Sequence, residues 1–423
     1  MSSPDEAKLM NTLASCYAQA HEVLHEKREP QIFMTGFPPK PDQLVTWGNW
    51  MRPPYNKWGF RNLVRLRPSI TVSCGKGVEE LSTEQVNLDA LNFASECGIN
   101  VRLDEHLLAS HADGFIVLHR GKVVYERYAN GHSADDRHIM FSVTKSLIGT
   151  LAEKLIRDGV LDPERKAIDY VPEFSGSAFA DATVRQLMDM SVAIQYTEKY
   201  DDPYSESSQF GYACGFFPAP REYAKYDSLY QFLPSLKKNG EHGGFFHYVT
   251  ATTEALAWVM ESASGKACHE HLTAIWSRIC CDRDGYFMAD PWGRGVAGAG
   301  FSATLRDMAR FGRLIANRGE HGGHSIIDPV VINTIAKGGD TAIFANDEDF
   351  SRWMPGASYR SQWYVFNDHS NAIVAGGIHG QYLFVDFDSD VVIVKQSSLP
   401  EAVGIFDADN VRALRAIAAH FKH

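Results

Sequence analysis

The stretch FSVTKSLIGTLAEKLIRDGVL, residues 141–161, joins a polar start to a long apolar periodicity. Ser142 and Lys145 stand three positions apart at its beginning, so both side chains emerge on one face if a helix starts here. The run stops at Gly159, and its apolar side chains recur at helical spacing, which predicts one amphipathic helix: Leu147, Ile148, Leu151 and Leu155. The elements on either side of this helix decide the fold.

Two predicted β-hairpins frame the helix in the chain. GFIVLHRGKVVYERYANG, residues 114–131, has two β-rich runs around an Arg-Gly-Lys turn. QYLFVDFDSDVVIVKQSS, residues 381–398, has the same form and turns at Asp388 to Asp390, and a helix over 410–421 follows it. Strands near both ends with helices between them predict an α+β fold, in which an antiparallel sheet formed by both chain ends carries an inserted helical lobe.

The length of 423 residues exceeds the roughly 250–300 at which a single hydrophobic core stops growing. We therefore expect an N-terminal helical arm over residues 1–45 and a main domain of two lobes over 46–423. The lobes are expected as an α/β lobe at about 46–160 and 295–423, and a helical lobe at about 161–294.

The composition limits which binding partners and which cellular compartment are expected. A net charge of −11 argues against nucleic acid or an anionic membrane as partner, since both favour a basic surface. The seven cysteines form no C-x-x-C pair, and free thiols in a reducing compartment are the simpler interpretation. The N-terminal residues lack the pattern of a signal peptide, and no apolar run approaches the ~20 residues of a membrane span. A cytoplasmic protein is predicted.

Ser142 and Lys145 have the chemistry of a nucleophile beside a base. A serine hydroxyl attacks well only when a neighbouring group removes its proton, and a lysine does so when burial or nearby positive charge lowers its pKa. The apolar helix that follows and Phe141 before it favour such burial. The alternative is structural: Ser142 caps the helix and Lys145 is solvated.

Two further stretches have the order and spacing of a known set of motifs. S-x-x-K is the nucleophile motif of penicillin-recognising enzymes, which add a second and a third element. Tyr248-Val249-Thr250, about a hundred residues downstream and just before a helix, corresponds to the second, usually Y-x-N or Y-x-S. Ala375-Gly376-Gly377, at the start of the last hairpin, stands in the place of the third, which is normally K-T-G.

From about Trp50 to the C-terminus the chain resembles the 6-aminohexanoate-dimer hydrolases, the nylon-oligomer hydrolases of the serine β-lactamase superfamily. The stretches that carry the resemblance are PPYNKWGF, DDRHIMFSVTKSLIGT, LMDMSVAIQYTEKYDDPYSE, SQWYVF and GGIHGQYLFVD. The resemblance implies the fold of serine β-lactamases and DD-peptidases, a small ester or amide substrate and no cofactor or metal. It also allows a homodimer.

The same resemblance implies the roles of the site residues. Ser142 is the acylated nucleophile, Lys145 is the base that takes its proton, and Tyr248 relays a proton to the leaving group and helps to activate the deacylating water. The oxyanion hole is formed by the backbone N–H groups of Ser142 and Ile378, and removing one such donor typically costs ~3–4 kcal/mol.

Three more residues correspond to positions near the substrate in that family. Tyr200 matches a tyrosine that closes over an amide substrate, and Trp363 and His379 match residues near the pocket. The alternative for Tyr200 is a loop aromatic residue, and for Trp363 and His379 it is packing in the core.

The chain departs from the family pattern at several positions. Thr250 replaces the usual Asn or Ser, and Gly298 stands where the nylon hydrolases place an asparagine, which weakens recognition of the linear nylon dimer. The absent K-T-G lysine weakens a β-lactamase interpretation. We rank ester hydrolysis first, linear amide hydrolysis of the aminohexanoate type second and β-lactam hydrolysis third. A non-catalytic binding protein is the alternative from another class.

A competing motif lies near the N-terminus. HEVLH, residues 21–25, matches the H-E-x-x-H of zinc peptidases, on a helix predicted over residues 5–28 and closed by Pro30. A zinc site also needs a third protein ligand, and the metzincin continuation is missing because Arg28 and Gln31 occupy its positions. We expect a polar stripe on a terminal helix and no metal, and surface positions for the pairs His269/His271 and His321/His324.

Overall fold

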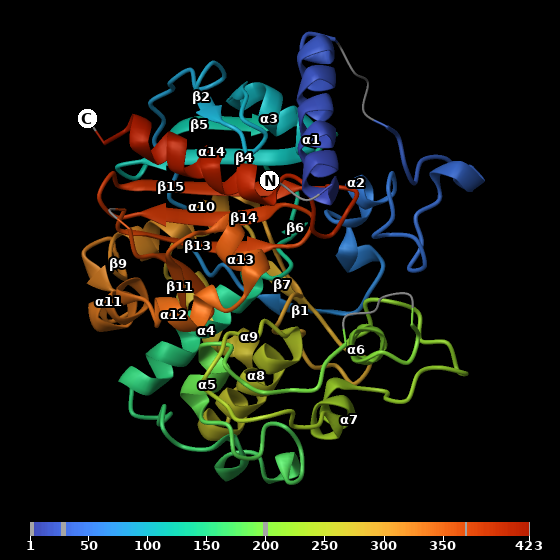
Figure 1. The fold of residues 1–423 in the computed structure, drawn as a ribbon, viewed down its shortest axis with the longest axis vertical. Coiled ribbons are helices and arrows are strands. Elements are labelled where there is room, and N and C mark those ends of the chain that lie inside the picture. Colours follow the sequence, from blue (N-terminus) through green and yellow to red (C-terminus); the bar gives the residue numbers. More distant parts are fainter. Residues whose placement is uncertain (1–3, 27–30, 198–201, 369, 423) are drawn as a thin grey trace.

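The computed structural model describes residues 4–26, 31–197, 202–368 and 370–422. Its centre is a seven-stranded antiparallel sheet in the order β11-β12-β13-β14-β15-β4-β5 (Figure 1). The strands are β4 (Ala112–His119), β5 (Lys122–Tyr128), β11 (Ala357–Arg360), β12 (Trp363–Phe366), β13 (Ala372–Gly377), β14 (Gln381–Asp386) and β15 (Val391–Ser397). Strands from distant parts of the chain thus meet where β15 pairs with β4, and both predicted hairpins and the α+β class are confirmed.

Each face of this sheet is covered by helices because the apolar side chains of its strands alternate with the pleat. On β15, Val392 and Val394 belong to one core cluster, whereas Val391 and Ile393 belong to the other. The first face packs against α4 (Val143–Arg157) and α10 (Leu305–Ala316). The second packs against α1 (Pro4–Val23), α3 (Leu103–Ala109) and α14 (Asp407–His420), of which Figure 1 shows α14 crossing in front of the sheet.

A second sheet and a group of helices lie beyond α4. The second sheet has the order β1-β7-β8-β6, with β1 (Ser69–Val72), β6 (His138–Ile139), β7 (Gly285–Met288) and β8 (Phe301–Ala303). The helices of this region are α5 (Val184–Met188), α6 (Glu206–Ala213), α7 (Leu229–Phe232), α8 (Thr250–Ser264) and α9 (Cys268–Trp276), gathered below the main sheet in Figure 1. Smaller elements complete the chain: α2 (Asn56–Gly59), α11 (Pro329–Lys337), α12 (Thr341–Ala345), α13 (Glu348–Trp353), β2 (Asn92–Ala94), β3 (Asn100–Arg102), β9 (Glu320–His321) and β10 (His324–Ser325).

The N-terminal helix is shorter than the sequence predicted. The prediction ran over residues 5–28, whereas α1 ends at Val23 and a turn follows at 24–26. His21 is therefore on the helix, but His25 lies in the turn. The prediction was wrong here because the residues after Val23 carry no helix-stopping signal before Pro30, so spacing alone could not locate the end.

Candidate active site

Ser142 stands at the turn between β6 and α4. The residue before it, Phe141, has a φ of +44°, a left-handed conformation that costs a bulky residue roughly 1–3 kcal/mol. The surroundings hold it there: its ring stacks on Trp50 at 6.4 Å and meets the edge of Phe60 at 5.0 Å between ring centroids. Strand β6 thus turns sharply into α4, and Ser142 is placed at the helix N-terminus with its side chain half-buried.

Lys145 lies next to Ser142, as the three-residue spacing predicted. Its Nζ is 2.7 Å from Ser142 Oγ, within the distance over which a base takes a proton, and 2.8 Å from the carbonyl oxygen of Gly298, to which it donates. The lysine is only 1% exposed. The solvated-lysine alternative is therefore wrong.

Tyr248 is brought to the same place by the start of α8. The Nζ of Lys145 lies 5.1 Å from the centre of the Tyr248 ring. The ring also contacts Phe350 at 5.1 Å between ring centroids, and Tyr364 stacks on it at 6.3 Å. Ser142, Lys145 and Tyr248, which are far apart in the sequence, thus form one cluster.

The end of β13 meets the start of α4 beside Ser142. A Cβ atom added at Gly377 would lie 2.6 Å from the carbonyl oxygen of Met140 and 3.1 Å from the nitrogen of Ser142, so only glycine fits here. Ile378 follows directly. Among the described residues, neither the N–H of Ser142 nor that of Ile378 donates to another backbone group. Two open N–H groups on adjoining segments are what an oxyanion hole requires.

The three residues expected near the substrate have different outcomes. Tyr200 lies outside the described residues. Trp363 is fully buried, and its Nε1 donates to Thr150 Oγ1 on α4 at 3.0 Å. His379 is 4% exposed, its Nδ1 lies 2.7 Å from the carbonyl oxygen of Leu399, and burial lowers its pKa to about 4. Both placements favour the alternative of core packing.

One member of the site gave no signal in the sequence. Glu254, on α8, is fully buried, and its Oε1 accepts a hydrogen bond from the N–H of Gly298 at 2.7 Å. Gly298 itself has no room for a side chain, because an added Cβ would lie 2.6 Å from Thr250 Cγ2. The two departures from the family pattern are therefore linked, because the Thr250 methyl occupies the space that a side chain at position 298 would need.

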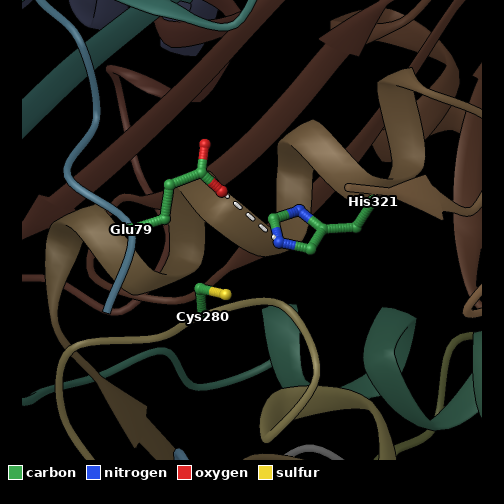
Figure 2. A group of neighbouring side chains, drawn as sticks. All are labelled: Glu79, Cys280 and His321. Carbon is green, nitrogen blue, oxygen red and sulfur yellow. Dashed lines mark ion pairs between the residues drawn. The ribbon is translucent and has the colours of Figure 1, made fainter. Parts of the chain in front are cut away.

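The histidine motifs do not form a metal centre. His21 Nδ1 lies 2.7 Å from Glu105 Oε1, and His25 is in the turn beyond the helix. In the described part of the chain, one group of three possible ligand side chains has atoms within 4.8 Å of one another: Glu79, Cys280 and His321 (Figure 2).

Arg313 already uses two of these three groups. Its Nη2 lies 3.0 Å from Glu79 Oε2 and 3.3 Å from His321 Nδ1. If Nε2 of His321 bound a metal, its Nδ1 would carry the proton and could not accept from the arginine. The positive guanidinium also opposes a second cation, so this donor set does not fit a metal ion.

Fold and cluster together define a serine hydrolase of the β-lactamase and DD-peptidase type. The sequence profile of the beta-lactamase family matches residues 102–417, and the chain belongs to this family. Within it, the chain belongs with the 6-aminohexanoate-dimer hydrolases, as its relatives show.

The 6-aminohexanoate-dimer hydrolase of Paenarthrobacter ureafaciens is 35% identical over 357 residues, which are 84% of this chain and 88% of that protein. A solved structure described as a candidate 6-aminohexanoate-dimer hydrolase from Bacillus anthracis superposes with a TM-score of 0.82 at 29% identity, over 91% of this chain and 98% of that one. A family VIII carboxylesterase shares the fold, with a TM-score of 0.53 at 18% identity over 73% of this chain and 92% of that one. The protein is therefore a hydrolase.

Proposed function

We propose that the protein hydrolyses esters and linear amides of small molecules through an acyl-enzyme on Ser142. The observation that carries this proposal is the position of Lys145 Nζ, buried and 2.7 Å from Ser142 Oγ, with the ring of Tyr248 beside it. No structural requirement brings these three groups together, which argues against a binding protein that merely keeps the fold.

In the acylation step, Lys145 takes the proton of Ser142 as the Oγ attacks the substrate carbonyl carbon. The resulting oxyanion accepts hydrogen bonds from the N–H groups of Ser142 and Ile378. When the intermediate collapses, the bond to the alcohol or amine breaks and that leaving group takes a proton through Tyr248. An ester on Ser142 remains.

In the deacylation step, a water molecule attacks the ester carbonyl carbon. Tyr248 helps to remove its proton, the same two N–H groups hold the second oxyanion, and Ser142 regains its proton as the acid leaves. Tyr200, from the family resemblance, is proposed to close over the substrate.

Short acyl esters are the proposed first substrate class, because an alcohol leaves more easily than an amine. Linear amides of the aminohexanoate type come second, since the named relatives act on the aminohexanoate dimer. A Cβ at Gly298 would lie 2.6 Å from the Thr250 methyl, so the asparagine of the nylon hydrolases has no room at this position, which favours this order. The Ala375-Gly376-Gly377 segment at the end of β13 carries no lysine, so β-lactam hydrolysis ranks third.

The test is intact-protein mass after exposure to a fluorophosphonate probe, combined with rates on p-nitrophenyl acetate, a linear aminohexanoate dimer and a chromogenic β-lactam. Ser142→Ala is expected to lose the adduct and all but a few per cent of turnover. Ser146→Ala is the matched control, because Ser146 is also on α4 but donates to the carbonyl oxygen of Gln362. A chelator is expected to change nothing. Turnover that survives Ser142→Ala, or disappears with the chelator, would contradict the mechanism.

We also propose a cellular compartment and an oligomeric state for the enzyme. None of the helices in the described ranges is long and apolar enough to cross a membrane. All seven cysteines are free, which supports a reducing compartment such as the cytoplasm. A homodimer is proposed from family resemblance alone, and light scattering on the purified protein would decide it.

A further inference from the structure

A buried ion pair lies beneath the loop that contacts Lys145. Glu254 is fully buried and Arg294, in the loop after β7, is 6% exposed. The Nη1 of Arg294 donates to Glu254 Oε2 at 3.0 Å, and its Nη2 donates to the backbone oxygen of Glu254 at 2.9 Å. The arginine thus fixes the carboxylate in one orientation.

The other bonds of this carboxylate go to the loop. Oε1 accepts from the N–H of Gly298 at 2.7 Å and Oε2 accepts from the N–H of Ala297 at 3.2 Å. The carbonyl of the same Gly298 accepts from Lys145 Nζ at 2.8 Å. Because a glycine restricts its own backbone least, the place of this carbonyl depends on what anchors the loop.

We propose that Glu254 is a positioning residue for Lys145. By anchoring the loop, it holds the Gly298 carbonyl against the lysine and so keeps Nζ within reach of Ser142 Oγ. This inference rests on the proposed function, in which Lys145 is the base. It explains why a charged side chain lies fully buried on α8.

Only a carboxylate can serve here. Three donors converge on its two oxygens, from Ala297, Gly298 and Arg294, and an ionised carboxylate is acceptor-only. A glutamine amide would turn N–H groups toward at least one of these donors. Burial raises the pKa of Glu254, and Arg294, the two backbone N–H groups and Lys145 oppose that rise.

The experiment compares Glu254→Gln with Glu261→Gln in the full-length protein. Glu261 is the matched control because its Oε2 also pairs with Arg294, at 3.4 Å, whereas its Oε1 accepts from the backbone N–H of Cys268 and not from the loop. Burst kinetics with p-nitrophenyl acetate give the acylation rate between pH 5 and about 9, the range over which His and perturbed Lys titrate. Thermal melting checks the fold of each variant.

Glu254→Gln is expected to slow acylation about 10- to 100-fold with little change in KM, the loss that a misplacement of about 1 Å produces. The rising limb of its pH profile is expected to move to lower pH, because a negative charge that favours the ammonium form of Lys145 is removed. Glu261→Gln should leave both quantities near wild type. Within the described ranges, Tyr248 also lies beside Lys145 and Tyr364 stacks on Tyr248, and both variants keep these two side chains.

Equal behaviour of the two variants in rate and pH profile would overturn the proposal. If Glu254→Gln does not fold, Glu254→Asp decides: it keeps the charge but withdraws the carboxylate from the loop, so slower acylation with an unmoved limb is expected. Wild-type acylation by Glu254→Asp would also overturn the proposal. Failure of the proposed function is a different result, in which the wild type itself forms no acyl-enzyme on Ser142.

Discussion

Replacing Gly377 with alanine tests the oxyanion hole without touching the nucleophile or the base. The new Cβ would lie 2.6 Å from the Met140 carbonyl oxygen, about 0.4 Å closer than the 3.0 Å below which real Cβ atoms essentially never come. This oxygen and the nitrogen of Ser142, the next nearest atom, belong to the backbone of the β6–α4 turn, and the packing of Phe141 holds that turn in place. The end of β13, with Ile378, must therefore move away from Ser142.

The size of the effect follows from the tolerance of such sites. Groups that stabilise a transition state must lie within about 0.5 Å of their working positions, and the loss of one oxyanion donor lowers kcat about 10²- to 10³-fold. We expect Gly377→Ala to lose a large part of that factor, between about 10- and 100-fold, in p-nitrophenyl acetate hydrolysis. Thermal stability should fall moderately, since the contact lies at a strand end.

Gly376→Ala is the matched control on the same strand. A Cβ at this neighbouring position would have its nearest contact at 3.6 Å, on the Tyr382 ring, which is ordinary van der Waals distance. The assays are the acylation rate from burst kinetics, labelling by the fluorophosphonate and a melting curve for each variant. If Gly377→Ala acylates as fast as Gly376→Ala, the amide of Ile378 is not an oxyanion donor and the reasoning fails.

Two other changes test the packing around the site and the core. Gly298→Ala should lower the rate of ester hydrolysis at least about tenfold, because its Cβ would meet Thr250 Cγ2 at 2.6 Å and displace the Gly298 carbonyl from Lys145. Adding Thr250→Ser removes that methyl group and should restore much of the rate. A double variant as slow as Gly298→Ala alone would contradict this account. Lys395 is fully buried, and burial lowers its pKa from 10.5 to about 7. At pH values between these two pKa values, Lys395 is protonated in the unfolded chain but neutral in the folded chain. The free energy of unfolding therefore rises with pH by up to about 1.4 kcal/mol per pH unit. In urea titrations at pH 7 and about 9, Lys395→Met should flatten this rise, whereas Met at the exposed Lys266 should not.

The sequence predicted the parts of the site that are local. Ser142 and Lys145 are three residues apart on a helix, and helical geometry brings their side chains together whatever the rest of the chain does. The two hairpins were predictable for the same reason, since period and turn residues are properties of short segments. The sheet that joins both chain ends was predicted instead from the order of strands and helices along the chain.

The contacts between distant residues could not be predicted from pattern. Glu254 and Gly298 meet across 44 positions, and Lys145 meets Gly298 across 153, so no window contains either pair. Trp363 is an aromatic residue in a strand, and only the pleat of β12 against α4 decides that its ring enters the core. Tyr248 was placed by resemblance to a family rather than by its own surroundings.

The packing of Trp50 and Phe60 against Phe141 shows how much of the chain the position of the nucleophile depends on. The segment shared with the beta-lactamase family begins at residue 102, but the rings that hold the turn before Ser142 come from well before it. The segment matched by the family profile is therefore smaller than the part of the chain that holds the nucleophile in place. A fragment that began at residue 102 would lack both rings, and with them the packing that holds Phe141 directly before the nucleophile.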